Sequence, residues 1–385
     1  MLSEIDQLID AAVKETGLND FGEDDFLEPL ERLTQALDSQ ARLNDFGLLR
    51  ANMTIHSGLG NRLRIQDHLL KNPLVRDEEI KSPIFIVGLP RTGTTALHHL
   101  LNQDSNNRTL RIWEAQDPIP PPQTKTYSSD SRITEQREKI SLTETFLPGF
   151  KAMHLIDAEE PDECYMLLNR AFMSVEYSAL FHIPDYANWL YEQLVPRGCY
   201  EYHRLQLQIL QSCHPGRWVL KAPFHQLGLE EILRLYPDAI IVQTHRSLGA
   251  VVASGCSFSA LLRRSGSDHI DLQEIGRDWM AMLRAYTSRF EKSRAELEDN
   301  HPGQFVDLMY SDFIADPLSG IKKIYAASGV MLDSESERRM SDWLAKNPQG
   351  KHGEHVYKLS DYGVSIDEVK NLFDEYLIRN DLTID

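Results

Sequence analysis

The sequence predicts an α/β protein with three layers, in which helices cover both faces of a central parallel sheet of four or five strands. Two observations predict this fold. Short, uninterrupted apolar runs such as residues 84–87 are bounded by Pro or Gly, which is typical of strands buried on both faces. Helical stretches alternate with these runs, and this alternation implies parallel strands joined by helical crossovers.

The amino-terminal part, residues 1–82, is predicted to be a helical segment without strands. Its apolar side chains recur at helical spacing over residues 5–13, 26–43 and 48–70. The pattern changes at Pro83, where the first strand begins. We expect the helices before it to pack against the sheet that follows.

The middle of the chain divides into two parts. Residues 83–130 hold the first strand, a turn, a helix and a proline-rich loop. Residues 131–213 are predicted to be a helical insertion, with helices over 133–147, 161–170 and 201–212. Because this insertion lies between two predicted strands, we expect it to line a ligand pocket.

The last part, residues 214–385, completes the predicted sheet. Strands are expected at 218–220, 239–242 and 305–308, and the first two are joined by a helix over 227–235. A further helix is expected from about Leu248. We treat the whole chain, residues 1–385, as a single domain, because no clear linker interrupts it.

Composition excludes several classes of protein. The formal net charge of −18 argues against broad binding to nucleic acid or anionic membranes. The four cysteines form no CxxC pair, and no His/Cys grouping has the sequence spacing of zinc ligands, so we expect reduced thiols and no metal. No apolar run approaches the length of a membrane span, and the acidic start is unlike a signal peptide. We therefore expect a cytoplasmic protein.

The turn after the first strand carries the main functional signal. Gly88 and Gly93 have the spacing of the nucleotide-binding P-loop, and such a turn directs backbone N–H groups at an anion. Thr94 stands where a P-loop kinase has the lysine that reaches the β and γ phosphates. The loop's cation is Arg91, so a donor without a γ-phosphate fits better. A purely structural turn is the alternative.

The loop resembles the 5′-phosphosulfate loop of sulfotransferases that use 3′-phosphoadenosine-5′-phosphosulfate (PAPS). In that family a lysine or arginine precedes a Gly-Thr-Thr sequence. The resemblance implies a P-loop-like fold, PAPS as co-substrate without a required metal, and donor contacts from the residues of this loop, namely Arg91, Thr92, Gly93, Thr94 and Thr95.

Three further segments resemble donor-binding elements of the same family. Arg246 is followed eight positions later by Ser254, as in the family's 3′-phosphate motif, although the proline that often follows the arginine is missing. Tyr310, after the last strand, matches the tyrosine near the adenine, or else is a core tyrosine. Lys351 and Gly353 resemble a basic tail loop over the 3′-phosphate, or else an ordinary solvated loop.

The transfer chemistry needs cations and a base. Arg91 and Lys221, which ends a predicted strand, are candidates for stabilising the transferred group, with a structural ion pair as the alternative for Lys221. Family members often have a histidine two residues after that lysine, where this chain has proline. We rank His154 first as the base, then His225, then Glu163, because histidine titrates near neutral pH.

We therefore expect a sulfotransferase that acts on the hydroxyl of a small acceptor. Aromatic side chains in the insertion favour a phenol or another apolar alcohol. A P-loop kinase using ATP and Mg²⁺, or a non-catalytic nucleotide-binding protein, are the alternatives. Nucleic acid is not an expected partner, and the sequence leaves open whether the chain forms a homodimer.

Overall fold

The computed structural model describes residues 4–146, 156–192, 197–348 and 358–384. Its centre is a five-stranded, fully parallel sheet with the strand order β2-β3-β1-β4-β5. The strands are β1 (Ile84–Ile86), β2 (Asn107–Thr109), β3 (Arg217–Lys221), β4 (Ile240–His245) and β5 (Phe305–Met309). The predicted α/β class and parallel sheet are confirmed. The short, polar edge strand β2 was not predicted, because it has no apolar run.

Side chains of the central strand alternate between two hydrophobic cores, as a strand buried on both faces requires. Ile84 and Ile86 point into the smaller core, whereas Phe85 and Val87 point into the larger one. The smaller core is covered by α4 (Thr94–Leu101), α15 (Tyr310–Ala315), α16 (Pro317–Ala327) and α17 (Ser334–Lys346).

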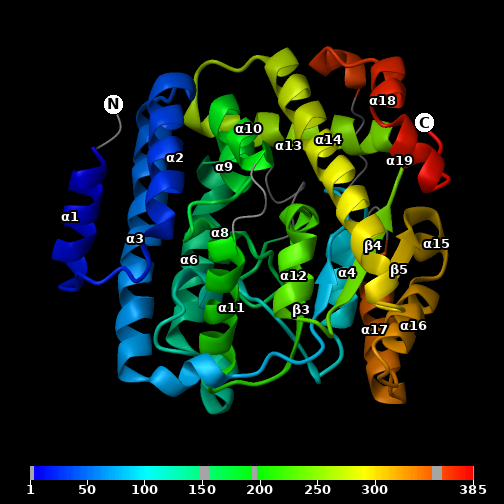
Figure 1. Ribbon diagram of the computed structural model, residues 1–385, viewed down its shortest axis with the longest axis horizontal. Helices are drawn as coiled ribbons and strands as arrows, with labels where there is room; N and C mark the ends of the chain where they lie inside the picture. Colours follow the sequence, from blue (N-terminus) through cyan, green and yellow to red (C-terminus); the bar gives the residue numbers. More distant parts are fainter. Residues whose placement is uncertain (1–3, 147–155, 193–196, 349–357, 385) are drawn as a thin grey trace.

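The larger core lies on the opposite face of the sheet. It is covered by α11 (Arg197–Gln211), α12 (Leu229–Leu235), α13 (Leu248–Gly266) and α14 (Leu272–Leu297). In Figure 1 the strands lie between α11 and α12 on one side and the group α15 to α17 on the other. The three-layer arrangement is therefore the one that alternating strands and helices predict.

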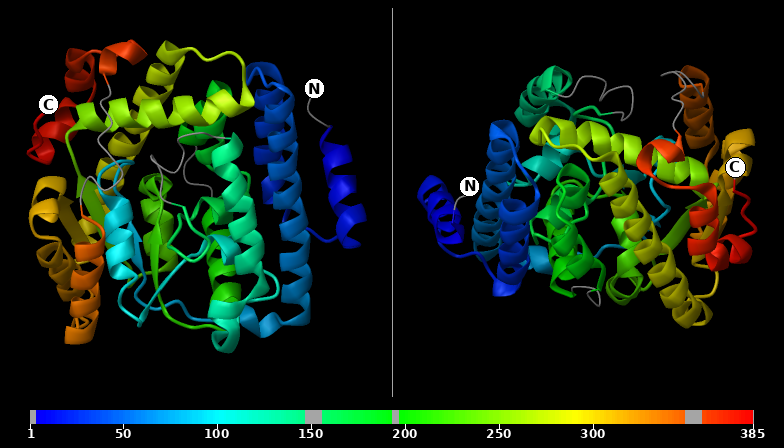
Figure 2. Two further views of the ribbon diagram at one scale, coloured as in Figure 1. Left: turned by 180° about the vertical axis from the view of Figure 1, so that it is seen from behind. Right: turned by 90° about the horizontal axis from the view of Figure 1, so that it is seen from above.

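The predicted amino-terminal helices stand together on the side away from the sheet's β5 edge (Figures 1 and 2). Ile55, Leu59 and Leu63 recur four residues apart on one face of the longest helix and are completely buried. The three helices are α1 (Ile5–Thr16), α2 (Leu27–Gln40) and α3 (Asp45–Lys71).

The insertion is helical, as predicted, but one helix begins later than expected. We predicted a helix over residues 161–170, whereas α8 spans only Tyr165–Asn169. The backbone N–H groups of Asp162 and Cys164 donate instead to the carbonyls of Leu110 and Lys221, at 2.8 and 2.9 Å. These contacts hold the preceding residues in a loop against the strand ends.

The remaining helices lie just before the insertion, within it and at the carboxyl terminus. In the described ranges, no helix has both the length and the apolar character needed to cross a membrane. These helices are α5 (Ile112–Gln116), α6 (Ser131–Phe146), α9 (Glu176–Leu180), α10 (Pro184–Glu192), α18 (Ile366–Leu372) and α19 (Asp374–Arg379).

The turn after β1 lies very close to β4. A Cβ atom at Gly88 would be 1.8 Å from the Oγ1 atom of Thr244, so glycine is required at this position. The hydroxyl of Thr92 donates to the carbonyl of Leu89 at 2.6 Å and lies 2.5 Å from the hydroxyl of Thr244. The turn is therefore fastened to the neighbouring strand by both packing and hydrogen bonds.

Replacing Gly88 by alanine should force the turn away from β4. Overpacking of this kind costs about 1–3 kcal/mol in the free energy of unfolding, measurable by urea denaturation. Adding Thr244→Ala removes the clashing hydroxyl, so the double variant should recover part of that loss. Strictly additive effects of the two substitutions would contradict the close approach.

Candidate active site

Arg91 and Gly93 both adopt left-handed backbone conformations in the turn that joins β1 to α4. Their φ angles are +68° and +88°. The left-handed conformation is unfavourable for arginine, and strain of this kind, about 1–3 kcal/mol, is concentrated at functional sites. At Gly93 the ring of Tyr310 lies 3.0 Å from the position of a Cβ atom, so glycine serves both the turn and this contact. This strained turn is the predicted phosphosulfate loop, and it ends at the start of α4.

The predicted 3′-phosphate residues converge on the same turn. The Nη1 atom of Arg246 donates to the carbonyl of Arg91 at 2.8 Å. The Nε atom of Arg91 donates to the hydroxyl of Ser254, on α13, at 2.9 Å. The guanidinium of Arg246 also stacks over the ring of Tyr310, 4.3 Å from its centroid. Residues that follow β1, β4 and β5 thus meet a residue of α13 at the carboxyl edge of the sheet.

Lys221 is the last residue of β3, beside the turn. Its side chain is only 3% exposed, and its Nζ atom lies 2.7 Å from Oε1 of Glu163. The same ammonium donates to the hydroxyl of Thr95 at 3.2 Å. The second carboxylate oxygen of Glu163 is buried and has no hydrogen-bond partner among the described residues. One oxygen of Glu163 is therefore paired with a cation while the other remains available.

A cavity adjoins this group. With its open mouth it has a volume of about 1720 Å³. Arg91, Thr94, Thr95 and Glu163 line one end of it. The rest of the wall is mainly apolar and comes from the insertion, α13 and α14, through Ile156, Tyr165, Met166, Val175, Ala179, Leu180, Phe258, Leu262, Trp279 and Met282.

The cavity also contains a polar region that the motifs did not indicate. Arg50, on α3, and Glu176, on α9, both line it. Burial raises the pKa of Glu176 and lowers the pKa of Arg50, and the electrostatic attraction between the two groups opposes both effects. Asp162 is a further lining residue, and burial raises its pKa to about 6. Asp162 directly precedes Glu163 in the sequence, but no motif indicated a role for it.

The predicted base residues differ in their position relative to the cavity. His154, our first choice, lies outside the described residues, as do Lys351 and Gly353. His225 is completely buried in the larger core, is not part of the cavity wall, and its Nδ1 atom lies 3.0 Å from the hydroxyl of Tyr200. Among the described base candidates, Glu163 is the one that lines the cavity.

Comparison with known proteins identifies the family. The family model described as "Sulfotransferase family" matches residues 83–334 of this chain. The chain belongs to the sulfotransferase family. The matched region contains the residues described above at the carboxyl ends of the strands, from the turn after β1 to Tyr310.

Solved structures of sulfotransferases resemble this one over nearly its whole length. Sulfotransferase STF1 from Mycobacterium tuberculosis H37Rv is 35% identical, with a TM-score of 0.86, and the match covers 97% of this chain and 99% of that one. Sulfotransferase STF9 from Mycobacterium avium is 29% identical, with a TM-score of 0.90, and the match covers 100% of this chain and 98% of that one.

A characterised relative has a named acceptor. The omega-hydroxy-beta-dihydromenaquinone-9 sulfotransferase Stf3 of Mycobacterium bovis is 25% identical over 315 residues, which is 76% of this chain and 72% of that protein. These findings establish that the chain is an enzyme of the sulfotransferase class, which transfers a sulfuryl group. The family implies PAPS as the donor, and a kinase is not favoured.

Proposed function

We propose that PAPS binds across the carboxyl ends of β3, β1 and β4, and that the acceptor is an apolar alcohol held in the adjoining cavity. One observation carries this proposal. Arg91 lines the cavity and also contacts both Arg246 and Ser254, so one residue joins the acceptor space to the 3′-phosphate motif. The donor would therefore lie with its sulfuryl end toward the cavity.

The charges at the strand ends suit a doubly anionic donor. Arg246 contacts a backbone carbonyl and an aromatic ring, and no carboxylate of the described residues pairs with it. Phosphate oxygens would give it charge-assisted, bidentate hydrogen bonds, which are stronger than these neutral contacts. We assign Arg246 and Ser254 to the 3′-phosphate, the turn from Arg91 to Thr95 to the phosphosulfate, and the ring of Tyr310 to the adenine.

Glu163 is our proposed base. Its free oxygen can accept the proton of the acceptor hydroxyl while that hydroxyl oxygen forms a bond to sulfur. The bond from sulfur to the donor's phosphate oxygen breaks, and its electron pair leaves with adenosine 3′,5′-bisphosphate. Lys221, between Glu163 and Thr95, is placed to stabilise the negative charge that develops on this leaving oxygen.

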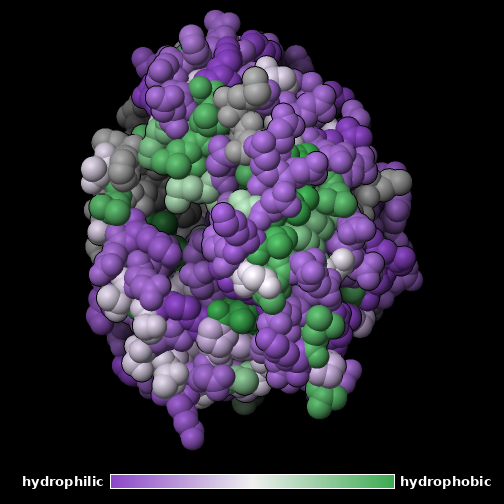
Figure 3. Space-filling view, turned by 90° about the vertical axis from the view of Figure 1, so that its left-hand side faces the viewer, coloured by the Kyte–Doolittle hydropathy of each residue, from purple (hydrophilic) through white to green (hydrophobic). Residues whose placement is uncertain are grey.

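The nature of the cavity supports an apolar acceptor. About half of its lining side chains are aliphatic or aromatic, and they lie mainly in the insertion, α13 and α14. Leu49 and Met53, which precede the lining residues Arg50 and Thr54 on α3, are 56% and 63% exposed. Figure 3 shows that hydrophobic residues form patches among hydrophilic ones on the side carrying the amino-terminal helices. The named acceptor of the Mycobacterium bovis relative, a hydroxylated menaquinone, belongs to the same chemical class.

The conservative variant Glu163→Gln tests the base. Loss of a general base should lower kcat about 100- to 10,000-fold, measured as transfer of labelled sulfate from PAPS. The bisphosphate product should still bind, because the side chain keeps its shape and the donor cations are unchanged. His225→Phe serves as a comparison. A normal kcat for Glu163→Gln with a large loss for His225→Phe would contradict the assignment.

The donor site is tested by Arg91→Ala and Arg246→Ala. Each substitution removes charged hydrogen bonds worth about 1.5–3 kcal/mol, so Kd for adenosine 3′,5′-bisphosphate should rise about 10- to 100-fold in calorimetric titration without magnesium. Arg338→Ala is the matched control, because this arginine is exposed on α17 and pairs with surface carboxylates. Binding of ATP with Mg²⁺ in place of the bisphosphate would instead support the kinase.

The acceptor is tested with a series of primary alcohols of increasing chain length. Each buried methylene group contributes about 0.8 kcal/mol, so kcat/KM should rise up to about fourfold per added methylene until the cavity is filled. Leu262→Glu, in the cavity wall, should abolish this trend, whereas Leu74→Glu, on the surface, should not. Equal kcat/KM values for short and long alcohols would contradict an apolar acceptor.

A further inference from the structure

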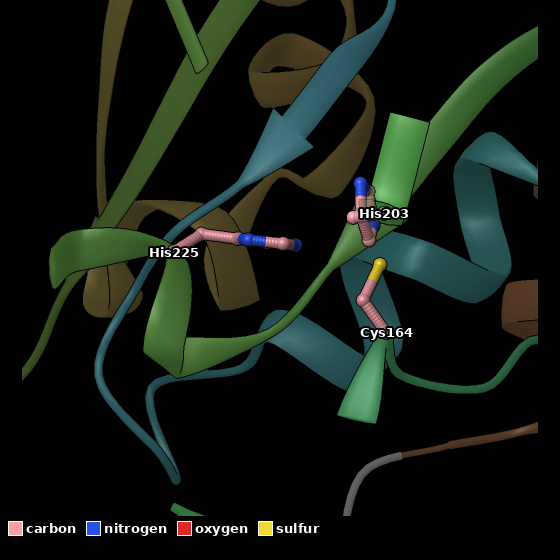
Figure 4. Close-up of side chains that lie close together, drawn as sticks. All are labelled: Cys164, His203 and His225. Atoms are coloured by element: carbon pink, nitrogen blue, oxygen red, sulfur yellow. The ribbon is translucent and has the colours of Figure 1, made fainter. Parts of the chain in front are cut away.

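Three buried side chains from distant parts of the sequence meet in the core next to the active site. Cys164 precedes α8, His203 lies on α11, and His225 lies in a short helix over Pro223–Gly228. One ligand atom from each residue, sulfur or ring nitrogen, lies within 4.8 Å of the others, and all three residues are buried. Figure 4 shows the three side chains pointing toward one another from separate elements.

Three of the four ring nitrogens of this cluster lack hydrogen-bond partners among the described residues. Within the described ranges, neither Nδ1 nor Nε2 of His203 has one, and Nε2 of His225 has none either. A buried polar atom without a partner costs about 1–3 kcal/mol, and such atoms in folded proteins require an explanation such as an ion or a water molecule. Three such nitrogens around one thiol therefore indicate a binding site for a further component, such as an ion.

The chemistry of the three groups identifies the class of that component. Neutral imidazole and thiolate are the forms that bind metals, and a metal bound to Cys164 would displace the proton of its thiol. A thiolate with two imidazoles favours zinc or copper(I), whereas calcium and magnesium require oxygen ligands.

We propose that Cys164, His203 and His225 form a binding site for a transition-metal ion of the zinc class. Three protein ligands would leave the fourth position of a tetrahedral zinc site to a water molecule. Neighbouring ligand atoms around tetrahedral zinc lie roughly 3.5 Å apart, so side-chain rotation has to contract the cluster by about 1 Å. The site lies outside the cavity wall, and its existence does not depend on which residue is the base.

Tyr200 supplies the outer contact that metal-binding histidines usually have. Its hydroxyl lies 3.0 Å from Nδ1 of His225. If Nδ1–H donates to this hydroxyl, the lone pair of Nε2 is directed away from it and is available to the metal. A hydrogen bond of this kind fixes both the tautomer and the orientation of a ligating ring.

The site lies directly behind the proposed catalytic pair. Cys164 follows Glu163 in the sequence, and its backbone N–H donates to the carbonyl of Lys221 at 2.9 Å. His225 lies four residues after Lys221. An ion bound to Cys164 and His225 would therefore join the two segments that carry Glu163 and Lys221, and we assign it a structural role in positioning them.

Metal analysis of the full-length, untagged protein tests the proposal directly. Protein produced in zinc-supplemented medium should contain close to one equivalent of zinc per chain. Production with cobalt should give the absorption bands of tetrahedral Co²⁺ together with a thiolate-to-cobalt charge-transfer band. Cys164→Ala and His203→Phe should lose the metal, whereas Cys256→Ala, which removes another buried thiol, should retain it. Wild-type protein with no stoichiometric metal would overturn the proposal.

The sign of a stability change provides a second, independent test. If the cluster holds no metal, His203→Phe removes two unpaired buried nitrogens and should leave Tm unchanged or raise it. If the cluster binds metal, the same substitution removes a ligand and should lower Tm. We expect a lower Tm, and a chelator should lower the Tm of the wild type but not that of the variant. A variant at least as stable as the wild type would refute the site, whatever happens to sulfotransferase activity.

Discussion

The ion pair between Lys221 and Glu163 is the contact on which the arrangement of the active site depends. Lys221 belongs to the sheet, whereas Glu163 belongs to the helical insertion, so this contact joins the proposed donor side to the proposed acceptor side. Both side chains are largely removed from water. Separating such a pair would leave an uncompensated buried charge, which is far more costly than the loss of a surface ion pair. The same burial strengthens the field that each group exerts on a reacting molecule.

The sheet and the convergence of Arg91, Arg246 and Ser254 could be predicted because their signals are local. Residues 84–87 form an apolar run of the kind that parallel strands require, and the turn that follows has its glycines and its cation at fixed spacing. Arg246 and Ser254 could be paired because one ends a strand and the other lies two turns into the following helix. In each case the physical constraint acts within a short stretch of sequence, so the sequence displays it.

Features that arise only from tertiary packing were not predictable. The requirement for glycine at position 88 comes from Thr244, a residue on another strand. The loop at residues 161–164 has proline and acidic residues that favour a helix start. Its backbone N–H groups at positions 162 and 164 instead donate to the carbonyls of Leu110 and Lys221. The grouping of Cys164, His203 and His225 has no sequence spacing to reveal it, because the three residues come from different elements. Sequence reasoning favoured histidine as the base on intrinsic pKa. Among the candidates that the structure describes, position relative to the cavity favours Glu163, whereas His154 lies outside the described residues.

The order of the strands has a consequence for synthesis of the chain. β1 lies between β3 and β4, yet about 130 residues separate it from the first of these partners. A nascent chain that ends before residue 217 therefore carries an apolar strand with both edges unpaired, and exposed edges of this kind readily pair with other chains. The amino-terminal helices and the insertion are synthesised before β3 and β4. They are therefore the parts of the chain available to cover β1 until its partner strands have been made.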